Sequence, residues 1–226
     1  MSSIRLDGPR LAPATGGRPE RLVVLVHGYG ADGQDLIGLA PHWARLLPDA
    51  AFVAPNAPER CAGSPFGYQW FPINRLDPEE MWRGVQHAAM ALDGFLDAEL
   101  ERHGLTSDRL ALAGFSQGTM MSLHVGLRRK MPPAAIVGYS GALAGAEHLK
   151  QEMTGKPPVI MIHGDADEMI PVHRMHEAVA ALGEVGVPVR WHISRGVGHG
   201  IAPDGLELGG RFLTDAFAGR LGTPAG

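Results

Sequence analysis

Short apolar runs alternate with longer amphipathic stretches along this chain, and the alternation restricts its fold more than any other feature. Most of the runs are apolar throughout, which is typical of parallel strands buried on both faces of a sheet. The strand candidates are Arg21–His27, Ala51–Ala54, Arg109–Phe115, Ala134–Tyr139, Pro158–His163 and Val189–Ser194. The intervening helix candidates are Asp35–Leu47, Pro78–Arg102, Gln117–Arg129, Val172–Leu182 and Gly205–Ala218.

This strand–helix order predicts an α/β fold with a doubly wound, mostly parallel sheet flanked by helices. Residues Ile4–Ala14 are a candidate antiparallel edge strand. No linker or composition shift divides the chain, so we expect a single domain over residues 1–226, with 219–226 as a frayed tail. The roughly 15 residues from Ala142 to Lys156 are too few for an inserted helical lid domain.

The overall charge and the cysteine content exclude several classes of partner. A net charge of −4 and a pI near 6.2 give no electrostatic footprint for nucleic acid. The first ten residues contain no signal-peptide core, and no apolar run approaches the length of a membrane span, so we expect no membrane insertion. One cysteine, Cys61, excludes an intrachain disulfide and fits a reducing, cytoplasmic location. No role is assigned to Cys61.

A candidate nucleophile lies between a predicted strand and a predicted helix. Residues Gly114–Gly118 match the pattern G-x-S-x-G in the strand–turn–helix setting of a nucleophile elbow, with Ser116 at its centre. The turn requires residues without a Cβ on both sides of the serine, since any side chain there would collide with backbone. The alternative is an ordinary turn with an N-capping serine. Ser140 is a weaker competitor because Ala142 replaces the second glycine.

A serine nucleophile needs a histidine base and an acid that orients the histidine. His199 lies in a glycine-rich loop after the last predicted strand, whereas His163 and His192 lie in strands and are more typical of packed core histidines. The order Ser116, Asp167, His199 is that of α/β-hydrolases. Asp165 and Glu168 are the neighbouring acid candidates, and His173 and His176 lack a third metal ligand.

The glycine-rich loop at Gly28–Gly33 matches G-x-G-x-x-G and raises a nucleotide-binding alternative. That function requires an acidic residue at the end of the next strand, and Val53–Asn56 contains none. In α/β-hydrolases the loop at this place supplies one backbone N–H to the oxyanion hole. We therefore predict that the backbone N–H groups of Tyr29 and Gln117 form the oxyanion hole.

Five segments, LVHGYGADGQDL, APNAPER, GFSQGTMMSL, IHGDADEMIP and GVGHGI, resemble in order and spacing the phospholipase/carboxylesterase family, which includes the acyl-protein thioesterases. The resemblance spans about residues 20–215 and favours a carboxylesterase of the bacterial type. It implies Ser116, Asp167 and His199 as the triad, and a substrate among esters or thioesters of short to medium acyl chains, lysophospholipids and acylated proteins. Thr119 and Tyr29 depart from the family pattern at positions that border the acyl site.

These observations predict a serine carboxylesterase that works through an acyl-enzyme on Ser116 and needs no metal or organic cofactor. Its partner is then a small-molecule ester or thioester, and the sequence is compatible with a homodimer. The alternatives are an acyl-protein thioesterase or lysophospholipase of the same family and, in another class, a non-catalytic ligand-binding protein on this fold. The apolar candidates for the substrate walls, each weighed against ordinary packing, are Phe66, Tyr68, Trp70, Phe71, Met169 and Ile170.

Overall fold

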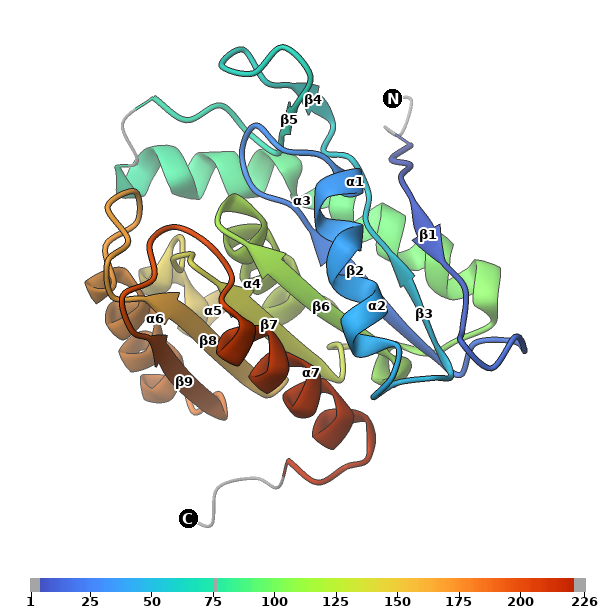
Figure 1. Cartoon of the computed structure of the whole chain (residues 1–226). Coiled ribbons are helices and arrows are strands. Elements are labelled where there is room, and N and C mark those ends of the chain that lie inside the picture. Colours follow the sequence, from blue (N-terminus) through green and yellow to red (C-terminus); the bar gives the residue numbers. More distant parts are fainter. Residues whose placement is uncertain (1–4, 75–76, 222–226) are drawn as a thin grey trace.

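The computed structural model describes residues 5–74 and 77–221 and contains one large sheet, flanked by helices (Figure 1). The seven strands lie in the order β1-β3-β2-β6-β7-β8-β9, and only β1 runs antiparallel to its neighbour. The mostly parallel α/β sheet predicted from the sequence is confirmed. The strands are β1 (Arg10–Leu11), β2 (Arg21–Val26), β3 (Ala50–Val53), β6 (Leu110–Phe115), β7 (Ala135–Tyr139), β8 (Val159–Gly164) and β9 (Val189–Ser194).

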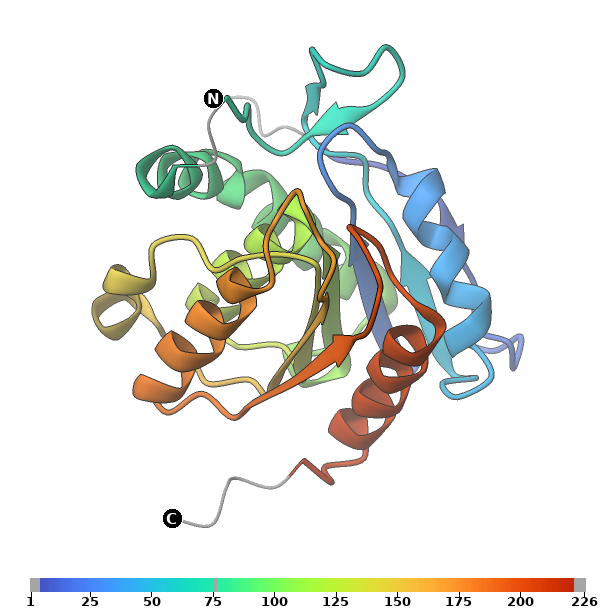
Figure 2. The same cartoon turned by 60° about the vertical axis from the view of Figure 1, so that its left-hand side comes forward.

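The helices cover the two faces of the sheet and create two hydrophobic cores (Figure 2). One face carries α3 (Pro78–His103), α4 (Gln117–Arg128), α5 (Leu149–Glu152) and α6 (His173–Glu184); the other carries α1 (Gly33–Leu36), α2 (Ala40–Trp43) and α7 (Pro203–Phe217). Successive strand residues alternate between the cores, so Val24 packs into the first and Val23 into the second. This two-sided burial explains why the central strands β2, β6, β7 and β8 are largely apolar, whereas the edge strand β9 exposes Arg190 and Trp191.

Local sequence signals fix the ends of the longest helix. The Asp77 side chain accepts a hydrogen bond from the Glu80 N–H at 2.8 Å, and Pro78 occupies the first turn, where its missing N–H costs nothing. Gly104 ends α3 with φ 66°, in the left-handed region that favours glycine. The helix predicted over Pro78–Arg102 is therefore confirmed, and the observed helix extends one residue further, to His103.

One predicted helix and one predicted strand differ in extent from the observed elements. The single helix expected over Asp35–Leu47 is α1, a 3₁₀ turn at Ile37–Leu39, and α2, because Pro41 cannot donate the hydrogen bond that would continue α1. The edge strand expected within Ile4–Ala14 is only β1, and Ile4 lies outside the described residues. Of the predicted tail, 222–226 also lies outside them.

A small hairpin and a short connection complete the fold. Strands β4 (Glu59–Arg60) and β5 (Tyr68–Gln69) pair antiparallel, and they escaped prediction because two residues carry no periodic signal. Between β7 and β8 the chain forms only the 3₁₀ turn Ala146–His148 and α5, so no lid domain is inserted there. Within the described residues no helix is long and apolar enough to cross a membrane.

Helix α4 carries a buried histidine outside the predicted site. His124 is 5 % exposed, and its ring packs edge-on against Trp82 with the centroids 5.3 Å apart. Its Nδ1 is buried with no hydrogen-bond partner in the described part of the chain. Burial, with a smaller contribution from Arg128, lowers the pKa of His124 from 6.5 to about 3. The folded protein therefore holds this imidazole in its neutral form.

Acid should destabilise the fold through His124. The unfolded chain takes up a proton there below pH 6.5 and the folded chain does not, so the stability present above that pH is lost as the pH falls. Between pH 7 and pH 5 we expect this residue to lower the free energy of unfolding by about 2 kcal/mol. In urea denaturation, the free energy of unfolding of His124→Gln should fall between pH 7 and pH 5 by about 2 kcal/mol less than that of the wild type. His42→Gln, on the exposed surface of α2, should leave the loss unchanged.

Candidate active site

Ser116 sits on a strained turn between β6 and α4, with φ 54° and ψ −116°. A Cβ at Gly114 would lie 2.3 Å from the Gly118 carbonyl oxygen, and a Cβ at Gly118 would lie 1.8 Å from the Val26 carbonyl oxygen. Neither position has room for a side chain, which is the steric condition for a nucleophile elbow. The turn thus presents Ser116 at the carboxyl end of β6, where the first turn of α4 begins.

Thr119 stabilises this turn through its side chain. Its side chain is fully buried, and its hydroxyl lies 2.8 Å from both the Gly114 and the Tyr139 carbonyl oxygens. A Cβ at Gly141 would contact it at 2.4 Å. The Thr119 side chain therefore holds the elbow together, and the expectation that this position borders the acyl site stays a prediction.

Asp167 and His199 meet at the same edge of the sheet. The His199 Nδ1 lies 2.8 Å from Oδ2 of Asp167, whose Oδ1 accepts hydrogen bonds from the backbone N–H groups of Met169 and Ile170, each at 2.9 Å. An ionised carboxylate only accepts, so His199 carries a proton on Nδ1 and leaves Nε2 available as an acceptor. The His199 ring lies 4.9 Å, centroid to centroid, from Phe115, the residue before Ser116.

Backbone contacts fix the loop that carries His199, which lies beside the 165–172 loop in both views (Figures 1 and 2). The Gly196 N–H donates to Asp165 Oδ1 at 2.6 Å, and the Ala166 N–H donates to the Val197 carbonyl at 3.0 Å. The Ser140 hydroxyl donates to the Gly200 carbonyl at 3.0 Å. Asp165 therefore braces the loop, whereas Asp167 contacts the histidine.

A second carboxylate holds the loop of His199 where it enters α7. Asp204, in the first turn of α7, lies 2.8 Å from His192 Nε2 and accepts a hydrogen bond from the Ser194 hydroxyl at 3.0 Å. The hydrogen bond from His192 is the main cause that lowers the pKa of Asp204. His192 is thus a hydrogen-bonded structural histidine, and its bond to Asp204 joins β9 to α7, the two elements that the loop connects.

The glycine-rich loop after β2 lies against the nucleophile, because a Cβ at Gly28 would come within 3.3 Å of the Ser116 Cβ. Buried His27 anchors this loop: its Nε2 accepts from the Ala57 N–H at 2.9 Å, so the proton resides on Nδ1, which donates to the Gly28 carbonyl at 2.7 Å. Burial lowers the pKa of His27 and keeps it neutral. The peptide is trans, so the Tyr29 N–H points opposite to that anchored carbonyl.

Gln117 has a second task that the sequence did not reveal. Its buried side chain accepts from the Trp70 N–H at 2.9 Å and donates to the Phe71 carbonyl at 2.8 Å. Trp70 and Phe71, predicted substrate contacts, are fully buried, and the Trp70 indole donates to the His27 carbonyl at 3.0 Å. These contacts join residues far apart in the chain, which no local pattern indicates.

The other predicted wall residues divide by exposure. Phe66 and Met169 are 82 % and 66 % exposed, whereas Ile170 is only 6 % exposed. Tyr68 is half-buried beneath the Arg60 guanidinium at 4.3 Å. A substrate role for any of them stays a prediction.

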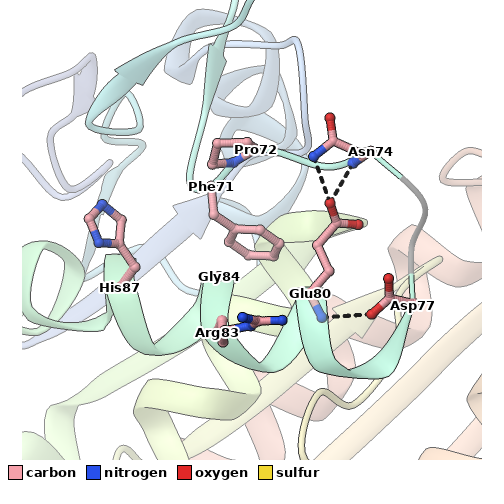
Figure 3. A pocket seen from close by; sticks show the side chains of 8 residues that line it. All are labelled: Phe71, Pro72, Asn74, Asp77, Glu80, Arg83, Gly84 and His87. Atoms are coloured by element: carbon pink, nitrogen blue, oxygen red, sulfur yellow. Dashed lines mark hydrogen bonds between the residues drawn. The ribbon is translucent and has the colours of Figure 1, made fainter.

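A cleft of about 600 Å³ opens between α3 and the segment after Phe71 (Figure 3). Glu80 there accepts hydrogen bonds from the backbone and side chain of Asn74, both at 2.8 Å, and His87 pairs with Glu59. None of the three predicted catalytic residues is part of its lining. The lining is Phe71, Pro72, Asn74, Asp77, Glu80, Arg83, Gly84 and His87. Among the described residues no group of three or more His, Cys, Asp or Glu side chains is arranged to hold a metal ion.

The fold and the elbow define an α/β-hydrolase. The model of the phospholipase/carboxylesterase family matches residues 13–215, and the chain belongs to that family. The crystal structure of esterase PE8 is similar with a TM-score of 0.91 and 44 % identity, covering 94 % of this chain and all of that one. Acyl-protein thioesterase 1 of Gibberella zeae is 29 % identical over 94 % of this chain and 97 % of its own length.

A second solved relative is the phospholipase/carboxylesterase of Dyadobacter fermentans, with a TM-score of 0.70 and 25 % identity over 93 % of this chain and 97 % of that one. The family membership predicted from the sequence is confirmed. The chain is therefore a hydrolase of the esterase and thioesterase group.

Proposed function

We propose that this protein is a serine carboxylesterase that hydrolyses esters of short to medium acyl chains through an acyl-enzyme on Ser116. The observation that carries the proposal is the hydrogen bond from His199 to buried Asp167, beside the strained turn of Ser116. The Asp167 carboxylate selects the histidine tautomer whose Nε2 accepts a proton, as a serine nucleophile requires. No step needs a metal or an organic cofactor.

The reaction has two halves. The Ser116 hydroxyl gives its proton to His199 Nε2 as its oxygen attacks the ester carbonyl. The tetrahedral oxyanion collapses when His199 returns that proton to the leaving alcohol, and the acyl group stays on Ser116. Water then gives a proton to His199 and attacks the acyl-enzyme, which releases the carboxylic acid and restores the serine.

The oxyanion hole consists of the backbone N–H groups of Tyr29 and Gln117 in this proposal. The His27 imidazole holds the Gly28 carbonyl on one side of its peptide, and the Tyr29 N–H therefore points to the other. The Gln117 N–H belongs to the first turn of α4, where the helix N-terminus favours negative charge. Donors fixed before the substrate arrives stabilise the oxyanion without a reorganisation cost.

Removing the proton donor of His27 should lower kcat and spare KM. In His27→Asn the amide nitrogen takes the place of Nδ1 and keeps the bond to the Gly28 carbonyl; in His27→Gln the amide group lies at the place of Nε2. We expect kcat to fall by about 10- to 100-fold in the glutamine variant, because one oxyanion donor loses its fixed direction. Steady-state kinetics on p-nitrophenyl butyrate should show a smaller loss for asparagine. Equal losses would show that His27 acts only through packing.

Esters and thioesters form the same acyl-enzyme and differ only in the leaving group. The structure alone therefore does not separate a carboxylesterase from a thioesterase. The similarity to acyl-protein thioesterase 1 favours a thioesterase as the second candidate. Hydrolysis rates for matched p-nitrophenyl esters and acyl thioesters with two to sixteen acyl carbons should decide between them. We expect the highest kcat/KM for esters of short to medium chains.

A fluorophosphonate probe tests the catalytic proposal itself and separates it from a non-catalytic binding protein on this fold. The probe should label one serine per chain, and peptide mass spectrometry should place the adduct on Ser116. Unlabelled protein would refute the mechanism, and an adduct on Ser140 would move the nucleophile to the end of β7.

A further inference from the structure

We propose that His163 is a positioning residue for the catalytic acid and holds the Asp167 carboxylate in the orientation that His199 requires. The inference rests on the proposed function. His163 lies near the end of β8 and is 1 % exposed. Its Nε2 is 2.7 Å from the Ile170 carbonyl oxygen and 3.2 Å from Asp167 Oδ2, the same oxygen that contacts His199.

These contacts determine the tautomer of His163. Its Nε2 faces a carbonyl oxygen and a carboxylate oxygen, both acceptors, so the ring proton resides on Nε2. The Nδ1 is buried without a partner among the described residues. The site therefore requires a hydrogen-bond donor at Nε2.

The two nitrogens of His163 have opposite consequences. A buried acceptor without a partner costs about 1–3 kcal/mol, and Nδ1 has none among the described residues. The Nε2–H offsets that cost, because it meets a carbonyl and a carboxylate oxygen. That donor points at the two groups that define the acid's position, Asp167 and the turn that follows it.

The bonds close a ring around the carboxylate. The Ile170 N–H donates to Asp167 Oδ1, the Ile170 carbonyl accepts from His163, and His163 also lies against Asp167 Oδ2. Oδ1 is held by two backbone N–H groups, whereas among the described residues Oδ2 has only His163 and His199 in hydrogen-bond reach. Without His163 the oxygen that orients the catalytic base depends on the base alone, and the 167–170 turn loses its tie to β8.

Three substitutions separate positioning from packing. In His163→Gln the side-chain amide nitrogen reaches the place of Nε2 and keeps the donor. His163→Leu keeps the volume without a donor, and His163→Asn is polar but too short to reach. We expect kcat per probe-titrated site to fall about 10- to 100-fold in the leucine and asparagine variants, with KM within about twofold, and to recover within about threefold in the glutamine variant.

A spectroscopic readout makes the assignment independent of turnover. The proton between His199 Nδ1 and Asp167 should give a low-field ¹H NMR signal in the wild type and in His163→Gln, and a shifted or absent signal in His163→Leu and His163→Asn. Thermal unfolding identifies any variant that fails to fold, in which case the remaining donor-free variant decides.

The outcomes are distinguishable. If the wild type does not react with the fluorophosphonate, the proposed function fails. If it reacts and a folded donor-free variant keeps wild-type kcat and the low-field signal, only the role of His163 is overturned. Equal loss of kcat in the glutamine and leucine variants also overturns it, because packing would then explain the effect.

Discussion

Replacing Ser116 with alanine should lower kcat/KM for p-nitrophenyl ester hydrolysis by at least ~10³-fold while the protein stays folded. The substitution removes the only atom that forms the acyl-enzyme in the proposed mechanism. It also removes no stabilising side-chain contact that we identify, and alanine is no worse than serine at the φ of 54° found here. Initial rates with p-nitrophenyl butyrate, together with circular dichroism, measure both halves of this expectation.

A matched control lies six residues further along the chain. Ser122 is fully buried in α4, and its hydroxyl has no hydrogen-bond partner in the described structure. Ser122→Ala should therefore keep wild-type activity and stability. Activity of Ser116→Ala within tenfold of the wild type would refute the acyl-enzyme, and an equal loss in Ser122→Ala would show that the assay reports damage to α4.

Replacing Asp167 with asparagine should lower kcat by about 10³- to 10⁴-fold with little change in structure. The amide oxygen can still accept from the Met169 and Ile170 N–H groups, so the side chain keeps its orientation. The amide nitrogen then faces two N–H donors, His199 Nδ1 and His163 Nε2, so donor stands against donor on that side. His199 must turn or change tautomer, and Nε2 no longer accepts the proton of Ser116. Active-site titration and steady-state kinetics at pH 7 give the comparison.

Asp165 provides the control for charge. Asp165 lies two residues from Asp167, and Asp165→Asn removes one negative charge just as Asp167→Asn does. The Asp165 carboxylate, however, accepts a hydrogen bond from the Gly196 N–H at 2.6 Å and braces the loop. We expect Asp165→Asn to cost no more than about tenfold in kcat, since an amide oxygen still accepts that bond. A loss as large as that of Asp167→Asn would mean that the loop, and not the acid, limits catalysis.

The sheet and the elbow were predictable because their signals are local. Apolar runs such as Leu22–Val26 are buried on both faces, and the glycines around Ser116 sit where a Cβ would strike backbone. The preference for Asp167 over Asp165 came from the family resemblance, since both residues follow β8 and lie between Ser116 and His199 in the chain, and only the structure separates their partners. The catalytic roles of Ser116, Asp167 and His199 remain predictions.

Contacts between distant residues were beyond sequence reasoning. Trp70 and Phe71 had the apolar character of a substrate wall, but Gln117, 47 and 46 residues away, draws that segment into the core. The tautomers of His27 and His163 likewise follow from Ala57 and Ile170, whose positions only the fold sets.

The bridge from Gln117 to Trp70 and Phe71 also ties the neighbouring hairpin to the helix that follows Ser116. The base of the hairpin is held a second time by the bond from the Gly30 N–H to the Tyr68 carbonyl at 2.9 Å. The tip between Cys61 and Gly67 is closed by its own backbone bond at 3.0 Å. The tip also lies against the Gly28–Gly33 loop, where a Cβ at Gly30 would come within 3.6 Å of the Ser64 Cβ, so a change in the length of the tip should reach the loop beside Ser116.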